Sequence, residues 1–389
     1  MERPLGSIEA GLVAIDEYAP FMVVAVLRLQ GTLKAARLQS ALEYLQKRHP
    51  LLRMRIVRER NRLSFMDDTF PPLMAEVIER AEDTDWLYAA EDAANTRLDA
   101  VAGELLRCIY LQGETESEII LVAHPAIVDE QSIATLFHEL LTFCIQDDRS
   151  EYPFFHKMPI PSEEMFPLSQ TAFTARSLPF LARTVMNKMQ HQQVNTNRKT
   201  HSDDLSSHCI LITLDIPAGD FQPLIRECQT RKVNIESILQ AAMMLSVHHY
   251  LYGGKSLPLQ ALTFSNMRPS LEPSPAEDTI ACYISVLSSF FGINPNTNLW
   301  ELTGRIQTTL EKAEKRGEVF IAARLGDRFP GIGTGIHALH TGTTALTCDS
   351  MIELHASYGD IQITGLHRFL TANPMCPVWM MRAGLLNDA

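Results

Sequence analysis

The order of strand-like and helix-like segments constrains the fold of this chain most strongly. Pro20–Gly31 (PFMVVAVLRLQG) is rich in β-branched residues and stops at glycine, which predicts a buried strand. Residues 35–48 place apolar side chains at helical spacing, and this helix should end before Pro50, because the residue before a proline avoids the α region. Two hairpins should follow, turning near Arg60-Asn61 and around Gly113–Glu118, and then an amphipathic helix for which Ser132 is the expected cap.

A change in composition divides the chain into two parts. Residues 151–207 contain clustered prolines and a long polar stretch, which indicates an exposed linker. Beyond it, residues 208–389 again alternate strand-like and helix-like segments, including a helix with its expected cap near Asn234. We therefore expect an α/β protein with an N-terminal lobe at 1–150, a linker at 151–207 and a C-terminal lobe at 208–389.

Charge, hydropathy and cysteine content exclude several classes of protein. The formal charge of −12 at pH 7 argues against a broad nucleic-acid surface. No apolar run approaches the ~20 residues that span a bilayer, and the first residues lack the pattern of a signal peptide. The seven cysteines are scattered and form no CxxC, which favours reduced thiols and a cytoplasmic location.

The stretch Leu121–Ser132 (LVAHPAIVDEQS) is the strongest candidate for a functional site. It joins an apolar strand to the start of a helix and contains His124 and Asp129. Pro125 fixes its own φ and pushes His124 toward extended geometry. A single histidine at a strand end is nevertheless more often a satisfied structural residue than a catalytic base, so this pattern alone leaves both interpretations open.

Two other groups of polar residues are further candidates. Arg268, in SNMRPSLEP, follows an apolar strand and needs a counter-charge if it is buried. Asp129 is a sensible partner for it. An exposed arginine is the simpler interpretation. The histidine pairs His248-His249 and His337/His340 lack carboxylates or cysteines at ligand spacing. The sequence therefore predicts no metal site.

With these motifs in place, the chain resembles the condensation-domain and polyketide-associated acyltransferase family, within the chloramphenicol-acetyltransferase-like superfamily. That family carries the motif HHxxxDG, and the aligned residues here run from His124 to Glu130 and continue to Ser132. Further segments agree in order along residues 1–310: RPLGSIEAGLVA, LQGTLKAARLQSALEYLQKRHPLLRMRI, GELLRCIYLQ, RKVNIESILQAAMMLSV, and NMRPSLEP followed by ACYIS.

The resemblance implies a specific fold and chemistry. Two acyltransferase-like lobes would form a V-shaped pseudo-dimer around a central cleft or tunnel, lined in part by Pro125, Ser132, Asn266 and Ser350. The second histidine of the motif would take a proton from an alcohol or amine that attacks an acyl thioester. The motif aspartate would form a structural ion pair with the arginine of the Asn-x-Arg-Pro segment, which here means Asp129 with Arg268.

Three departures surround the expected site. The base position is Pro125, which has no titratable group, and Glu130 replaces the motif glycine. A late segment that often reads Ser-Asn-x-Gly in the family is CDSMIEL here, containing Ser350. A general base typically contributes ~10²–10⁴-fold in rate. His124, one position away, and Glu130, if its pKa were raised, are the two alternative bases.

Two functions follow from the resemblance and its departures. The first is an acyltransferase of lipid or secondary-metabolite biosynthesis, with an impaired or relocated base, that moves an acyl group from a thioester to a hydroxyl or amine. The second is a catalytically silent relative that binds a ligand, carrier protein or partner enzyme. Either would hold no permanent cofactor, and acyl-CoA or a phosphopantetheine-linked acyl group, on an acyl or peptidyl carrier protein, would be its co-substrate.

Overall fold

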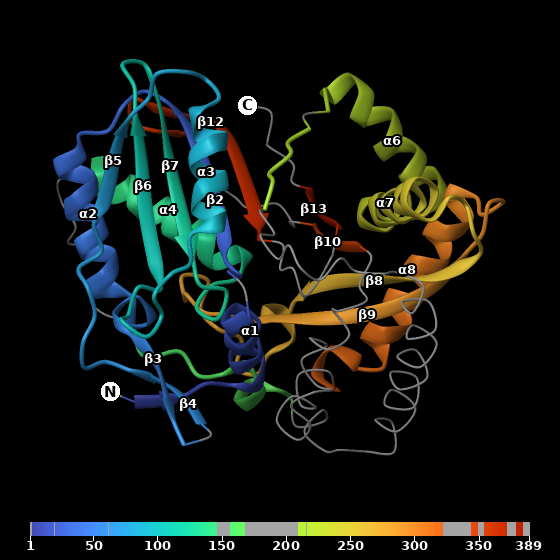
Figure 1. Ribbon diagram of the computed structural model, residues 1–389, viewed down its shortest axis with the longest axis horizontal. Coiled ribbons are helices and arrows are strands. Elements are labelled where there is room, and N and C mark those ends of the chain that lie inside the picture. Colours follow the sequence, from blue (N-terminus) through green and yellow to red (C-terminus); the bar gives the residue numbers. More distant parts are fainter. Residues whose placement is uncertain are drawn as a thin grey trace, which may run out of the picture.

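The computed structural model describes residues 2–18, 20–60, 62–145, 156–167, 209–214, 216–321, 344–348, 354–371 and 379–383. Two α/β lobes lie side by side in Figure 1, and the pair of long strands β8 and β9 extends from the C-terminal lobe toward α1 of the N-terminal lobe. The predicted α/β class with two lobes is confirmed.

A six-stranded sheet with the order β11-β12-β2-β7-β6-β5 forms the N-terminal lobe. Its strands are β2 (Val23–Gln30), β5 (Ala75–Glu79), β6 (Leu106–Gln112), β7 (Glu116–Ala123), β11 (Ser357–Tyr358) and β12 (Ile361–Leu370). The helices of this lobe are α1 (Ser7–Tyr18), α2 (Ala35–Arg48), α3 (Asp85–Asn95) and α4 (Glu130–Ile145). A small sheet, ordered β1-β4-β3, contains β1 (Glu2–Pro4), β3 (Arg55–Glu59) and β4 (Arg62–Met66).

Alternation along the strands separates two apolar layers. In β2, Ala25, Leu27 and Leu29 join the core beneath α2 and α4, whereas Val24 and Val26 face the opposite layer with α3. Successive side chains of a strand point to opposite faces, so a continuous apolar run is buried on both. This explains why residues 20–31 read as a buried strand, and the helix predicted to end before Pro50 does end at Arg48.

The C-terminal lobe has a four-stranded sheet with the order β13-β10-β8-β9. Its strands are β8 (Leu257–Asn266), β9 (Ile284–Ile293), β10 (Thr344–Cys348) and β13 (Trp379–Ala383), and its helices are α6 (Ala218–Arg231), α7 (Ile235–Tyr252) and α8 (Leu299–Lys315). Apolar residues of α7 and α8 pack together with those of β8 and β9. The predicted cap of α7 is correct, since the Asn234 side chain accepts a hydrogen bond from Ser237 N–H at 2.9 Å.

The lobe boundaries predicted from the sequence differ from the structure in two places. Strand β12 pairs with β2, so residues 357–370 add to the N-terminal sheet although they follow the C-terminal lobe in sequence. Within the predicted linker, residues 156–167 contain Met165 and Phe166, which are buried in the large core to which both halves of the chain contribute. Burial of these apolar side chains holds the segment in place. The polar stretch 168–208 lies outside the described residues.

Three short 3₁₀ helices also belong to the described residues. They are η1 (Pro50–Arg53), η2 (Ser162–Met165) and η4 (Arg268–Ser270). Among the described helices, none is long and apolar enough to cross a membrane. Five cysteines of the described segments are buried thiols outside any disulfide: Cys108, Cys144, Cys209, Cys228 and Cys282.

Candidate functional site

The motif forms a tight turn between β7 and α4. His124 ends the strand: its N–H donates to the Leu105 carbonyl at 2.9 Å, and its own carbonyl accepts from Ile127 N–H at 3.0 Å. Pro125 stands in the turn, where a residue without an N–H donor is tolerated. The chain is therefore held on both sides of the position where the family has its base.

Ser132 is not the cap of α4, which corrects the sequence prediction. The helix begins at Glu130, and Asp129 Oδ1 accepts from the N–H of Ser132 at 2.8 Å. A carboxylate that accepts from the third helical N–H is an N-cap, and it also opposes the positive end of the helix dipole. Asp129 is therefore the cap, and Ser132 lies inside the first turn.

His124 is enclosed by the protein. The residue is 1% exposed, and its ring nitrogen Nδ1 accepts a hydrogen bond from Ala126 N–H at 3.1 Å. Burial lowers the pKa of His124 to about 4, so the ring is neutral near pH 7. Since Nδ1 accepts, the single proton of the neutral ring is on Nε2, and Nε2 has no hydrogen-bond partner among the described residues.

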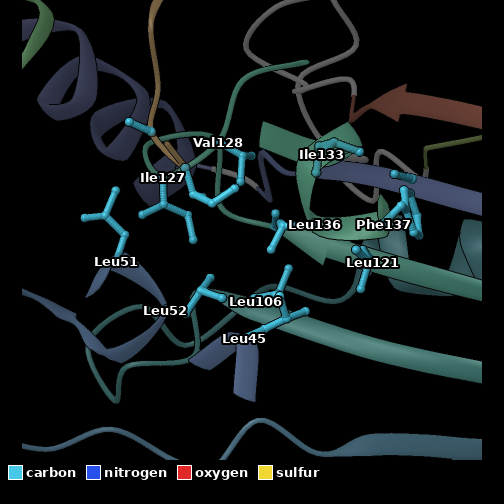
Figure 2. Packing of buried hydrophobic residues seen from close by; sticks show 14 of the residues in the cluster. Leu45, Leu51, Leu52, Leu106, Leu121, Ile127, Val128, Ile133, Leu136 and Phe137 are labelled. Atoms are coloured by element: carbon cyan, nitrogen blue, oxygen red, sulfur yellow. The ribbon is translucent and has the colours of Figure 1, made fainter. Parts of the chain in front are cut away.

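The turn itself is packed with apolar side chains. Pro125 is buried, and Ile127 and Val128 are 0% and 2% exposed. Figure 2 shows these two side chains in the same apolar cluster as Leu51 and Leu52, which follow α2. The described surroundings of the base position therefore place an apolar core where the family's mechanism has a proton acceptor.

Asp129 and Arg268 form a buried ion pair across the two lobes. Arg268 donates from Nε to Asp129 Oδ2 at 2.7 Å and from Nη2 to Oδ1 at 2.9 Å, and the two side chains are 9% and 4% exposed. Nη2 also donates to the Thr279 carbonyl at 2.8 Å. Two parallel N–H···O bonds fix both distance and orientation. The structure thus brings together the pair that the resemblance implied.

Ser132 and Asn266 support this ion pair. Ser132 Oγ is fully buried, donates to Asp129 Oδ1 at 2.8 Å and accepts from the N–H of Ala281 at 3.1 Å. The Asn266 side chain accepts from Arg268 N–H at 2.9 Å. Of the residues expected to line a cleft, Pro125 and Ser132 are thus buried, whereas Asn266 is exposed. Ser350 lies outside the described residues.

Glu130 is the motif's only ionisable replacement. It is the first residue of α4 and is partly exposed, whereas residues 121–129 are all buried. A carboxylate in the first turn of a helix is stabilised in its ionised form by the dipole. Of the two alternative bases, Glu130 is the residue with solvent exposure.

A second polar cluster was not anticipated from the sequence. Glu139 of α4 accepts from Arg48 Nε at 3.0 Å and lies 2.7 Å from His49 Nε2. His156 stacks on His49 with 4.9 Å between ring centroids, and Arg48 also donates to Asp278 at 2.9 Å. These residues come from distant parts of the chain, and no sequence spacing relates them. We call this set the α2–α4 polar cluster.

Comparison with known proteins places this geometry in a family. The family model of the condensation domain matches residues 16–320. None of the curated protein sequences matches the chain.

Solved structures show the same fold at low identity. TRI3 trichothecene 15-O-acetyltransferase from Fusarium sporotrichioides has a TM-score of 0.72 at 11% identity, covering 99% of this chain and 88% of that one. Polyketide synthase associated protein 5 from Mycobacterium tuberculosis has a TM-score of 0.65 at 16% identity, covering 99% and 90%. SgcC5 from Streptomyces globisporus has a TM-score of 0.63 at 18% identity, covering 98% and 90%. Because the family model covers most of the sequence and the fold agrees along nearly all of it, the chain belongs to the condensation-domain family.

Proposed function

We propose that the protein binds an acyl thioester, carried on coenzyme A or on an acyl or peptidyl carrier protein, and that its motif does not catalyse rapid transfer of the acyl group. Membership of the condensation-domain family supports the thioester as ligand, because the resemblance implies such donors for the whole group. The burial of Pro125 at the base position is the observation on which the proposal rests.

The geometry of His124 supports the loss of base catalysis. A general base needs a free lone pair within hydrogen-bond reach of the proton that it abstracts. The accepting nitrogen of His124 already receives the Ala126 N–H, and the other nitrogen carries the ring proton. To act as a base, His124 would have to lose a hydrogen bond of the turn and leave a buried position, so we do not assign it this role.

The preserved ion pair supports a binding function. Asp129 and Arg268 join the two lobes through two hydrogen bonds, the pair that the resemblance implied. Without a base, a condensation-type reaction is expected to slow by ~10²–10⁴-fold, whereas substrate binding does not depend on that group. The protein would therefore retain ligand recognition while turnover is slow or absent.

Acyl transfer with Glu130 as base is the second candidate. The partial exposure of Glu130, next to fully buried motif residues, favours it over His124. In this mechanism the Glu130 carboxylate takes the proton of a hydroxyl or amine as the acceptor attacks the thioester carbonyl. The acyl group forms an ester or amide, and the thiol leaves. Replacement by glutamine would remove this proton acceptor with little change in size.

Binding and turnover of acyl-CoAs test the proposal together. Isothermal titration calorimetry with acyl-CoAs of increasing chain length measures binding, and a thiol reagent measures release of coenzyme A in the presence of alcohols or amines. A parallel series uses acyl groups on a phosphopantetheinylated carrier protein. We expect saturable binding of one donor class and no thiol release above the rate without protein.

Three variants separate the alternatives. We expect Pro125→His to release thiol where the wild-type protein does not, because it restores a titratable base at the motif position. Turnover by the wild-type protein that Glu130→Gln abolishes would replace our proposal with the second candidate. Wild-type turnover that His124→Ala abolishes would show that His124 is the base, and absence of binding to every thioester would reject the proposed ligand class.

A further inference from the structure

The α2–α4 polar cluster has the composition of a metal site, which no sequence spacing indicated. We propose that His49, Glu139 and His156 bind one divalent transition-metal ion of the Zn²⁺ class. The potential ligand atoms of these three side chains all lie within 4.8 Å of one another. In tetrahedral zinc sites with bonds of about 2.1 Å, ligand atoms are roughly 3.4 Å apart. The ligand atoms would therefore have to draw closer together to bind an ion.

The ring stack places the two histidines side by side next to Glu139. His49 and His156 are nearly parallel, with an interplanar angle of 10°, and Glu139 Oε2 lies 2.7 Å from His49 Nε2. His49 is 1% exposed, whereas the side chain of His156 is 20% exposed. His156 thus forms the accessible side, from which an ion could enter. An imidazole nitrogen binds a metal in the plane of its ring, so His156 would have to turn out of the parallel stack to share an ion with His49.

Two buried ring nitrogens in this cluster lack partners. Among the described residues, His49 Nδ1 and His156 Nε2 make no hydrogen bond, although His156 Nε2 lies 3.4 Å from the Asp278 carboxylate. A buried polar atom without a partner costs free energy, about 1–3 kcal/mol. Imidazole nitrogens with one carboxylate oxygen suit zinc-class ions, and an ion bound by His156 Nε2 would satisfy a nitrogen that has no hydrogen bond here.

Arg48 would orient the carboxylate and does not exclude a cation. It donates to Glu139 Oε1 at 3.0 Å, which leaves Oε2 on the histidine side, and to Asp278 at 2.9 Å. The carboxylates of Glu139 and Asp278 and the guanidinium of Arg48 together carry a net charge of −1. This charge attracts a cation. Hydrogen bonding of this kind to a ligating carboxylate is typical of protein metal sites.

The ion would connect segments that are distant in sequence. His49 follows α2, Glu139 belongs to α4, and His156 lies in the segment that packs on the N-terminal core. Asp278, beside this site, belongs to the loop that also contains Thr279, the partner of Arg268. A bound ion would thus stabilise the region where the C-terminal lobe meets α4. This inference does not depend on the proposed function.

A proton is the competing occupant. His49 could be protonated and form a simple ion pair with Glu139, with His156 stacked on it. Metal binding and protonation predict different results for the purified full-length protein after treatment with a chelator. We expect one Zn²⁺ per chain by mass spectrometry after dialysis against Zn²⁺, and a higher melting temperature that depends on Zn²⁺ concentration.

Variants assign the ion to these residues. We expect His156→Ala to weaken Zn²⁺ binding more than about 100-fold, because loss of a group that merely orients a ligand costs 10–100-fold. His138→Ala is the matched control: His138 is also on α4 and half-buried, but it is paired with Tyr358 at 2.8 Å. It should bind Zn²⁺ as the wild-type protein does, and circular dichroism shows whether each variant is folded.

Co²⁺ provides a measurement on the unchanged protein. We expect visible absorption bands of four- or five-coordinate Co²⁺ with nitrogen and oxygen ligands, displaced by Zn²⁺ at one equivalent. A wild-type protein that binds no stoichiometric Zn²⁺ and gives no such Co²⁺ bands would overturn the proposal. Undiminished binding in folded His156→Ala would overturn it as well.

Discussion

Removal of the Arg268 side-chain charge tests the role of the ion pair between the lobes. Arg268→Met keeps an unbranched apolar chain of similar length but loses the hydrogen bonds to Asp129, Ser132 and Thr279. Asp129 would remain 4% exposed at its side chain, with hydrogen bonds only from Ser132 and the N–H of Tyr283. An uncompensated buried carboxylate is the main consequence.

The expected loss of stability is about 3–5 kcal/mol, the usual cost of breaking a buried ion pair by removing one partner. Asp129→Asn should cost a similar amount, because it leaves the Arg268 charge buried. The double variant should lose less than the sum of the two single losses, with a coupling of ~0.5–3 kcal/mol. A coupling of this size shows that the two side chains interact, because two independent defects would add.

Urea unfolding followed by circular dichroism measures these losses through the midpoint and the m-value. Arg231→Met is the matched control, since Arg231 pairs with Glu227 at 2.6 Å on α6 while both side chains are about half exposed, at 47% and 45%. An exposed pair four residues apart contributes ~0.3–0.5 kcal/mol. The reasoning would be refuted if Arg268→Met cost no more than Arg231→Met, or if the double variant were fully additive.

Three further predictions concern the N-terminal lobe. The pKa of His124 is about 4 in the folded protein and 6.5 ordinarily, so the unfolded chain takes up the proton first as pH falls. The free energy of unfolding should therefore decline between pH 6.5 and 4 by on the order of 3 kcal/mol. Urea midpoints of His124→Asn should decline less over the same range. Tyr110→Phe should cost about 1–3 kcal/mol in the same assay, because the hydroxyl accepts from Leu33 N–H at 2.7 Å and donates to the Leu33 carbonyl at 3.0 Å. A loss below about 0.5 kcal/mol would mean that water replaces the hydroxyl. Phe137→Ala should cost about 3–5 kcal/mol by thermal or urea unfolding, since Phe137 is 0% exposed between α4 and the sheet. Tyr88 is 68% exposed, so Tyr88→Ala should change stability by less than about 0.5 kcal/mol. Equal effects of the two substitutions would contradict the described core.

Local patterns predicted much of the fold because each depends on neighbouring residues. The buried strand at residues 20–31 and the end of α2 before Pro50 follow from β-branched content and proline geometry. The error at the start of α4 has a similarly local cause: Asp129 and Ser132 are both good caps, and only the conformation of the turn selects Asp129.

Contacts between distant segments could not be predicted in this way. The pairing of β12 with β2 joins residues more than 300 positions apart, and the α2–α4 polar cluster combines segments around residues 48, 139, 156 and 278. Composition and periodicity contain no information on such pairings. The Asp129–Arg268 contact was expected only through the resemblance to a known family, since spacing cannot relate two residues 139 positions apart.

The protonation of His124 tests the central claim most directly. In ¹⁵N-histidine-labelled protein, long-range ¹H–¹⁵N spectra, assigned with His124→Asn, distinguish the two ring nitrogens and follow them with pH. We predict a neutral ring protonated on Nε2 with a pKa of about 4, as expected for a buried ring whose Nδ1 accepts from Ala126. A ring protonated on Nδ1, or one that titrates near 6.5, would mean that His124 has a proton-accepting nitrogen available, and our account of the motif would be wrong.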